Sequence, residues 1–161
     1  MARALIEAGY ATDIGDAFNR WIGPGRPGYI PRYKLAPDDA VRLVRSAYGV
    51  PTLAHPAGIL RHVSAAEAQV IVPLVAAGMQ GLECYYGDYD NQTVSHLLEL
   101  AGKYQLIPTG GSDYHGPNMH PTPLGGRFVP TSALEQLRAQ AAANRRQSAQ
   151  RFVLPPAADP G

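Results

Sequence analysis

The sequence predicts an α/β fold built on a parallel sheet, and three features of the chain favour this prediction. Short apolar segments alternate with longer helical ones, tight glycine turns connect them, and polar residues follow two of the apolar segments. Strands that alternate with helices over short loops favour right-handed crossovers and a parallel sheet. In such sheets the loops at the carboxyl ends of the strands build the site.

Composition limits the possible functions. The chain has 161 residues, of which 45% are apolar and 17% charged, as expected for one globular domain. A net charge of +1 argues against independent binding to a long nucleic acid or an anionic membrane. A short nucleotide remains possible, because one or two arginines suffice to bind it.

Cysteine content and hydropathy indicate a reducing, aqueous setting. Cys84 is the sole cysteine, so the chain forms no internal disulfide framework, and its strand-like neighbours predict a small buried hydrophobe. No segment reaches the roughly 18 consecutive apolar residues that span a bilayer. The amino terminus lacks the features of a signal peptide, and we expect a cytoplasmic protein.

The first third of the chain predicts two helices and a loop. Residues 1–8 predict a helix, and Thr12 is a good N-cap for a second helix over 13–22. That second helix places three apolar side chains at core spacing: Phe18, Trp21 and Ile22. The loop that follows, residues 23–34, is dense in glycine and proline. It carries the basic residues Arg26, Arg32 and Lys34.

Two interpretations of this loop remain open. It is either a packed surface connection or a flap whose arginines meet a phosphate, since guanidinium groups match phosphate oxygens.

Three strands with intervening helices are expected next. Pro37 suits the first turn of a helix running to about Tyr48, with apolar positions at Val41, Leu43 and Val44. The expected strands cover residues 50–54, 81–85 and 106–107. The helix over 65–78 contains Pro73, which should kink or divide it. Asp90 should cap a helix to about Tyr104.

The stretch from Gly110 to Gly116 (GGSDYHG) organises the predicted site. Asp113 and His115 lie two residues apart, and in an extended backbone such residues face the same side. A carboxylate and an imidazole suit a divalent metal. The alternative is a polar turn with a satisfied histidine. Since His55 also follows a predicted strand, three side chains of metal-ligand type at two strand ends favour a metal site.

The carboxyl-terminal part predicts a last short strand over 127–129. Ser132 and Glu135 form a capping box for a helix to about Gln147. Residues 148–161 are expected to be a disordered tail, which leaves residues 1–147 as the domain.

Other polar residues are weaker candidates. Glu83 is either a ligand or, as we favour, a strand residue that bonds a neighbouring loop or faces a helix. We expect His62 to face solvent from a loop and His96 to lie at the surface or core edge. Asn118 and His120 are close enough to the Asp113 motif to reach a substrate.

Three segments together resemble a known family: RPGYIPRYKLAPDDAVRLVRSAYGVPTLAHP, GLECYY and GGSDYHGPN. They are similar to the carboxyl half of the PHP (polymerase and histidinol phosphatase) metal-dependent phosphoesterases. The resemblance is strongest to the branch with the 3′,5′-nucleoside bisphosphate phosphatases, and it covers about residues 2–127. It implies a partial, distorted seven-stranded (β/α)7 barrel whose metal ions lie at the carboxyl ends of the strands.

The resemblance also implies residue roles. His55, Asp113 and His115 would be ligands of divalent manganese, iron or zinc, with His115 near the substrate phosphate. Arg26 or Arg32 would steady a phosphate. The family's amino-terminal Asp-Leu-His-x-His strand has no counterpart here, and Ala36 stands where relatives often have a helix-capping Ser or Thr. The start within a helix leads us to expect that the amino-terminal strands are missing.

Three hypotheses follow. The first is a phosphoesterase that hydrolyses phosphomonoesters, such as nucleoside 3′,5′-bisphosphates or short oligonucleotide ends, with metal-activated water. The second is an inactive fragment, or half of a split enzyme completed by another chain or by self-association. The third is a nucleic-acid accessory module, which the near-zero net charge disfavours.

Overall fold

The computed structural model describes the chain except residues 32–33, 63–64, 66, 117–121 and 152–161. Its internal contacts divide the chain into two compact units, Met1–Leu35 and Ala36–Gly161. We had expected one domain over residues 1–147, and that boundary remains a prediction. Each unit is described by itself.

The first unit contains the two helical segments that the sequence predicts. Helix α1 covers Ala2–Glu7, and α2 (Ile14–Ala17) continues into a π-helical turn, η1 (Phe18–Ile22). Asp13, one residue beyond the predicted Thr12, is the N-cap, and its side chain accepts a hydrogen bond from the Asp16 backbone N–H.

The prediction that the apolar side chains of the second helix are core residues holds only in part. Phe18 is 50% exposed, contrary to the expectation of a core residue. Trp21 is half-buried, and its indole N–H donates to the Tyr10 carbonyl oxygen at 2.8 Å.

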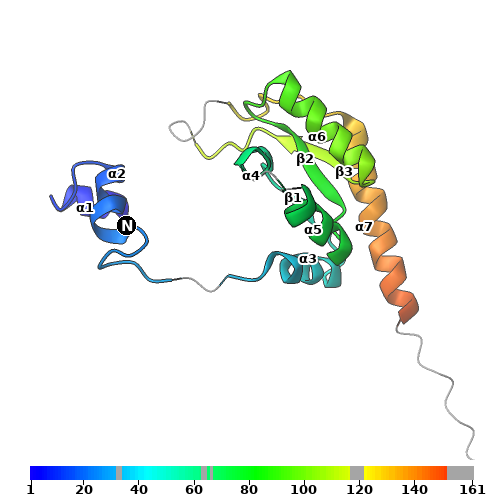
Figure 1. Cartoon of the computed structure of the whole chain (residues 1–161), viewed down its shortest axis with the longest axis horizontal. Coiled ribbons are helices and arrows are strands. Elements are labelled where there is room, and N and C mark those ends of the chain that lie inside the picture. Colours follow the sequence, from blue (N-terminus) through cyan, green and yellow to red (C-terminus); the bar gives the residue numbers. More distant parts are fainter. Residues whose placement is uncertain (32–33, 63–64, 66, 117–121, 152–161) are drawn as a thin grey trace, which may run out of the picture. The chain divides into compact units, whose positions relative to one another are not determined.

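A parallel sheet forms the centre of the second unit, which confirms the α/β prediction (Figure 1). Its described strands are β1 (Thr52–Leu53), β2 (Gly81–Tyr86) and β3 (Ile107–Gly111), in the order β1-β2-β3. Strand β1 is shorter than the predicted 50–54. Strand β3 extends through Gly111, so the glycines that we assigned to a loop belong to the strand. A PHP-type barrel remains a prediction.

The helices of the second unit follow the predicted order, except that α4 lies where we expected a loop. They are α3 (Pro37–Ser46), α4 (Ala57–His62), η2 (Glu67–Ile71), α5 (Val72–Ala77), α6 (Asn91–Lys103) and α7 (Thr131–Arg151). Pro37 lies in the first turn of α3, Pro73 lies where η2 gives way to α5, and the Asp90 carboxylate caps α6 by accepting from the Thr93 N–H. No helix among the described residues is long and apolar enough to cross a membrane.

Three details of this unit differ from the sequence-based expectations. Residues 127–129 form no strand. Helix α7 continues to Arg151, so residues 148–151, which we placed in a disordered tail, are helical, while 152–161 lie outside the described residues. On α3 Val41 is buried, but Leu43 and Val44 are 58% and 40% exposed, because only one stripe of the helix packs on its neighbours.

The hydrophobic core lies where β2 packs against α5 and α6. Leu82 and Cys84 of β2 are completely buried, together with Ile71 and nearly all of Leu97. The prediction for Cys84 is thus confirmed. Its burial, with a smaller effect of the neighbouring Glu83 charge, raises the pKa of the thiol to about 12.

Asn144 of α7 joins the helix to the amino-terminal side of the sheet. It is only 4% exposed, and its amide donates to the Gly49 carbonyl oxygen at 2.7 Å and to the Gln80 side chain at 2.9 Å. Its side-chain oxygen accepts from Arg45 at 2.5 Å. A buried amide with these partners specifies where α7 docks.

A β-bulge interrupts the pairing of β2 with β3 near the carboxyl ends of the strands. Glu83 pairs with Thr109, but the next paired residues are Tyr85 and Gly110, so Cys84 is the extra residue of β2. A Cβ atom on Gly110 would lie 2.3 Å from the Tyr85 carbonyl oxygen. The sequence therefore needs glycine here for close approach of two backbones.

The Gly110→Ala substitution should lower the free energy of unfolding by about 1–3 kcal/mol, because the added methyl group meets backbone that must move. Urea unfolding of both variants would measure this. Gly111→Ala is the matched control, since a Cβ there has no neighbour within 4 Å and the change should stay within about 0.5 kcal/mol. Equal stability of the two variants would contradict the role of Gly110.

Cys84 should react with a disulfide reagent about a thousandfold more slowly in the folded chain at pH 8 than in urea. The reason is that the thiolate is the reacting species and the folded pKa lies near 12, against about 8.5 for a free thiol. The raised folded pKa also means that its contribution to stability is complete below about pH 8.5 and is lost as pH rises toward 12. Rapid labelling of the folded chain would show that the thiol is accessible.

Candidate functional site

The predicted ligands lie beyond the carboxyl ends of the two outer strands. His55 follows β1, and Asp113 and His115 follow β3. Between them β2 ends at Tyr86, which contacts both sides of the site. The parallel order β1-β2-β3 explains this, because it brings the carboxyl ends of all three strands to one edge of the sheet.

Tyr86 binds the carboxylate of Asp113. Its hydroxyl donates to Asp113 Oδ2 at 2.8 Å. Burial, followed by this hydrogen bond, raises the pKa of Tyr86 to about 12, so the hydroxyl stays protonated and remains a donor at neutral pH. The Asp113 side chain is 30% exposed, so part of it remains accessible to solvent.

His115 contacts the same residue through its Nδ1 atom, which lies 2.6 Å from the Asp113 carbonyl oxygen and 3.5 Å from Oδ1. A carbonyl oxygen only accepts, so the contact places a proton on Nδ1 and leaves the Nε2 lone pair in the neutral ring. The ring is 61% exposed. Metal-binding histidines commonly have this arrangement, with the second nitrogen donating to a carbonyl or carboxylate.

His55 is held through its backbone. Its N–H donates to Glu83 Oε2 at 2.6 Å, and its ring lies edge-on to Tyr86 with centroids 5.9 Å apart. Both His55 and Asp113 have positive φ angles, 33° and 51°. Such conformations cost side-chain-bearing residues about 1–3 kcal/mol and concentrate at functional sites. The other two described non-glycine residues with positive φ, Tyr48 and Gln105, lie just after helices α3 and α6.

Tyr89 supports the first residues after His55. Its ring lies 4.8 Å from that of Tyr86, centroid to centroid, and its hydroxyl accepts a hydrogen bond from the Ala57 N–H at 3.0 Å. The segment from His55 to Ala57 is therefore held at two backbone N–H groups by side chains that follow or belong to β2.

The side chains of His55, Asp113 and His115 are of types that bind a divalent metal. They do not by themselves form a complete coordination sphere. An oriented imidazole and a hydrogen-bonded carboxylate are the chemistry that such an ion needs. Among the residues that the structure describes, however, no three His, Cys, Asp or Glu side chains are grouped closely enough to hold an ion. Joint ligation by His55, Asp113 and His115 remains a prediction.

The other predicted residues divide into three groups. Arg26 is exposed in the first unit, and Arg32, Asn118 and His120 lie outside the described residues. His62 ends helix α4, where we expected a loop. Glu83 bonds the loop after β1, the role that we favoured over that of a ligand. Binding of phosphate by Arg26 and Arg32 remains a prediction.

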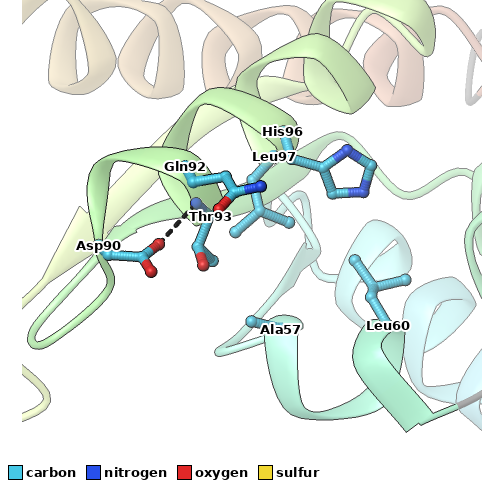
Figure 2. A pocket seen from close by; sticks show the side chains of 7 residues that line it. All are labelled: Ala57, Leu60, Asp90, Gln92, Thr93, His96 and Leu97. Carbon is cyan, nitrogen blue, oxygen red and sulfur yellow. Dashed lines mark hydrogen bonds between the residues drawn. The ribbon is translucent and has the colours of Figure 1, made fainter.

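His96 is exposed, as expected, and lines a hollow of about 380 Å³ between α4 and the start of α6. Figure 2 shows Ala57 and Leu60 on the α4 side, facing Asp90, Gln92, Thr93, His96 and Leu97 on the other. The hollow adjoins the backbone that Tyr89 holds, since Ala57 belongs to both.

Sequence reasoning missed the parts played by Tyr86 and Tyr89. Neither residue was among the predicted site residues. The available signal was their position: one tyrosine ends the middle strand and the other lies three residues later, while residues of metal-ligand type follow the strands on either side. The hydroxyl group of a partly buried tyrosine usually has a hydrogen-bond partner, so such a residue can hold a neighbouring group in place.

The chain is similar in sequence to a phosphatase, a cyclic phosphodiesterase and exoribonucleases. The chain is 30% identical over 128 residues to a 3′,5′-nucleoside bisphosphate phosphatase of Chromobacterium violaceum, which covers 80% of this chain and 43% of the relative. It is 37% identical over 78 residues to a phosphoribosyl 1,2-cyclic phosphate 1,2-diphosphodiesterase of Eggerthella lenta, 48% of this chain and 28% of that protein. A 5′-3′ exoribonuclease of Escherichia coli is 28% identical over 72% of this chain and 39% of its own length.

Two solved structures are similar. One, described as a metal-dependent phosphoesterase from Bifidobacterium adolescentis, superposes with a TM-score of 0.65 and 28% identity over 86% of this chain and 48% of the other. The second, an amidohydrolase from C. violaceum with bound sulfate and no metal, gives 0.62 and 26% identity over 86% and 49%. No family model matches the chain. The chain spans less than half of each of these proteins, and over that part its similarity is consistent with a metal-dependent phosphoesterase domain of PHP type.

Proposed function

We propose that the chain forms the strand-end part of a phosphomonoesterase site that uses divalent metal ions. The observation that carries the proposal is the linked group His55, Tyr86, Asp113 and His115 at one edge of a parallel sheet. The kinship with metal-dependent phosphoesterases supports it.

The residues have distinct roles in this proposal. Asp113 offers a carboxylate oriented by the Tyr86 hydroxyl, and His115 offers Nε2 because its Nδ1 proton is directed at the Asp113 carbonyl oxygen. His55 offers an exposed imidazole from a backbone held by Glu83. Manganese, iron or zinc ions, when bound, would supply an activated water and neutralise charge on the phosphate oxygens.

The proposed substrates are small phosphomonoesters, such as nucleoside 3′,5′-bisphosphates or the ends of short oligonucleotides. Relatives named for a nucleoside bisphosphate, a cyclic phosphate and RNA support a phosphorylated ribose as the common element. The sulfate in one similar structure is a tetrahedral dianion like a phosphate group. Arg26 and Arg32 are the proposed phosphate-binding cations.

A second possibility is that this stretch is inactive by itself and works only when further ligands join it. Two observations favour it. The described residues group no three metal-ligating side chains, and the matched relatives are more than twice as long as the part represented here. The further ligands would come from another segment or chain, or from self-association.

The Asp113→Asn substitution should weaken binding of Mn²⁺ to the purified chain by at least about a hundredfold. It removes a ligand charge, and loss of even an outer-shell partner commonly costs ten- to a hundredfold. Calorimetric titration measures the affinity. Glu99→Gln, an exposed change on α6 that also removes one negative charge, is the control and should bind as the wild type does. Equal affinities would remove Asp113 from the proposed site.

Hydrolysis of p-nitrophenyl phosphate and of a nucleoside 3′,5′-bisphosphate should require added Mn²⁺ and release inorganic phosphate. The phosphomonoesterase proposal expects turnover that falls strongly in Asp113→Asn and whose KM rises in Arg26→Ala, because a phosphate partner is lost. Metal binding without turnover would instead favour the incomplete site. Absence of both in the wild-type chain would contradict the proposal for this chain.

A further inference from the structure

The middle strand contacts the predicted ligands on both sides through two side chains. Glu83 reaches across to β1 and accepts the His55 N–H at 2.6 Å. Tyr86 reaches toward β3 and donates to Asp113 Oδ2 at 2.8 Å. Glu83 and Tyr86 therefore link the ends of the two outer strands, which do not pair with each other in the described sheet.

The β-bulge explains how Glu83 and Tyr86, three residues apart in β2, can both bond residues at the carboxyl-terminal edge of the sheet. In a regular strand, residues three apart face opposite sides of the sheet. The extra residue Cys84 between the paired positions Glu83 and Tyr85 shifts this alternation by one. The bulge fits only because Gly110 has no side chain, since a Cβ there would lie 2.3 Å from the Tyr85 oxygen.

We propose that Glu83 and Tyr86 are positioning residues that set the backbone of His55 and the carboxylate of Asp113 for metal binding. The inference rests on the proposed function, and it adds two residues that hold the ligands without ligating the ion. Glu83 acts on the left-handed His55 backbone, which a side-chain-bearing residue adopts only with support. Tyr86 fixes one carboxylate oxygen of Asp113 and leaves the other available to a metal ion.

The chemistry of each contact explains why these residue types are needed. The Glu83 carboxylate is an acceptor with a full negative charge, which makes its hydrogen bond to the His55 N–H stronger than one to a neutral acceptor. Tyrosine combines a protonated hydroxyl with a ring, and the Tyr86 ring packs between His55 and Tyr89. Phenylalanine would keep that packing and lose only the donor.

The test uses substitutions that leave the packing in place. Tyr86→Phe removes the hydroxyl, and Glu83→Ala removes the acceptor, while Glu83→Gln keeps a neutral acceptor oxygen. Tyr85→Phe is the matched control, because Tyr85 belongs to the same strand and its hydroxyl has no hydrogen bond among the described residues. Each variant of the 161-residue chain is titrated with Mn²⁺, unfolded in urea, and examined by amide hydrogen exchange at His55.

Tyr86→Phe and Glu83→Ala should weaken Mn²⁺ binding by about ten- to a hundredfold at a nearly unchanged urea midpoint. Glu83→Gln should recover most of the loss, and Tyr85→Phe should match the wild type. In the absence of metal, the His55 amide should exchange at least about tenfold faster in Glu83→Ala than in the wild type, because its hydrogen bond is lost.

The outcomes separate this inference from the proposed function. If the wild-type chain binds Mn²⁺ and both Tyr86→Phe and Glu83→Ala bind it equally well, the positioning role is overturned and the proposed function stays intact. A wild-type chain that binds no Mn²⁺ would contradict the proposed function and with it the positioning role toward metal. Unchanged exchange of the His55 amide in Glu83→Ala would overturn the role of Glu83 irrespective of metal.

Discussion

The pairing of strand β2 on both of its edges is the constraint on which the rest of this structure depends. Leu82 and Cys84 of this strand form the centre of the core, and the parallel partners on either side bring three strand ends to one edge. The residue types that suit metal and phosphate chemistry lie just beyond those ends. The same strand therefore supplies both the stability of the unit and the geometry of the site.

The two ends of the sheet are specified by different polar contacts. On the amino-terminal side, buried Asn144 joins α7 to Gly49 and Gln80. On the carboxyl-terminal side, Glu83 and Tyr86 join the middle strand to the residues after β1 and β3. The first set fixes how the helix docks, and the second orients chemically active groups. Hydrogen bonds in partly buried surroundings carry such specificity because an unpaired group is costly there.

The β-bulge in β2 affects both the packing of the strand against Gly110 and the contacts of Glu83 and Tyr86 with the predicted ligands. A regular β2 would turn either Glu83 or Tyr86 to the other face of the sheet, and one of the two contacts would be lost. The bulge in turn requires glycine at position 110, so the GG sequence before the Asp113 motif is explained by backbone approach rather than by loop flexibility. His55 and Asp113, the predicted ligands on either side of β2, also adopt positive φ angles that favour glycine.

The sequence by itself determined the alternation of helices and strands, the burial of Cys84, and the position of His55, Asp113 and His115 after strands. These features depend on local signals: hydrophobic periodicity, glycine and proline positions, and caps such as Asp90. The exposure of Phe18 and the absence of a strand at 127–129 were not predictable in this way, since both depend on which surfaces find a partner. Only the tertiary structure decided that Tyr86 would meet Asp113 and that Glu83 would hold His55, because these pairs are 27 and 28 residues apart and meet across neighbouring strands whose register includes an extra residue.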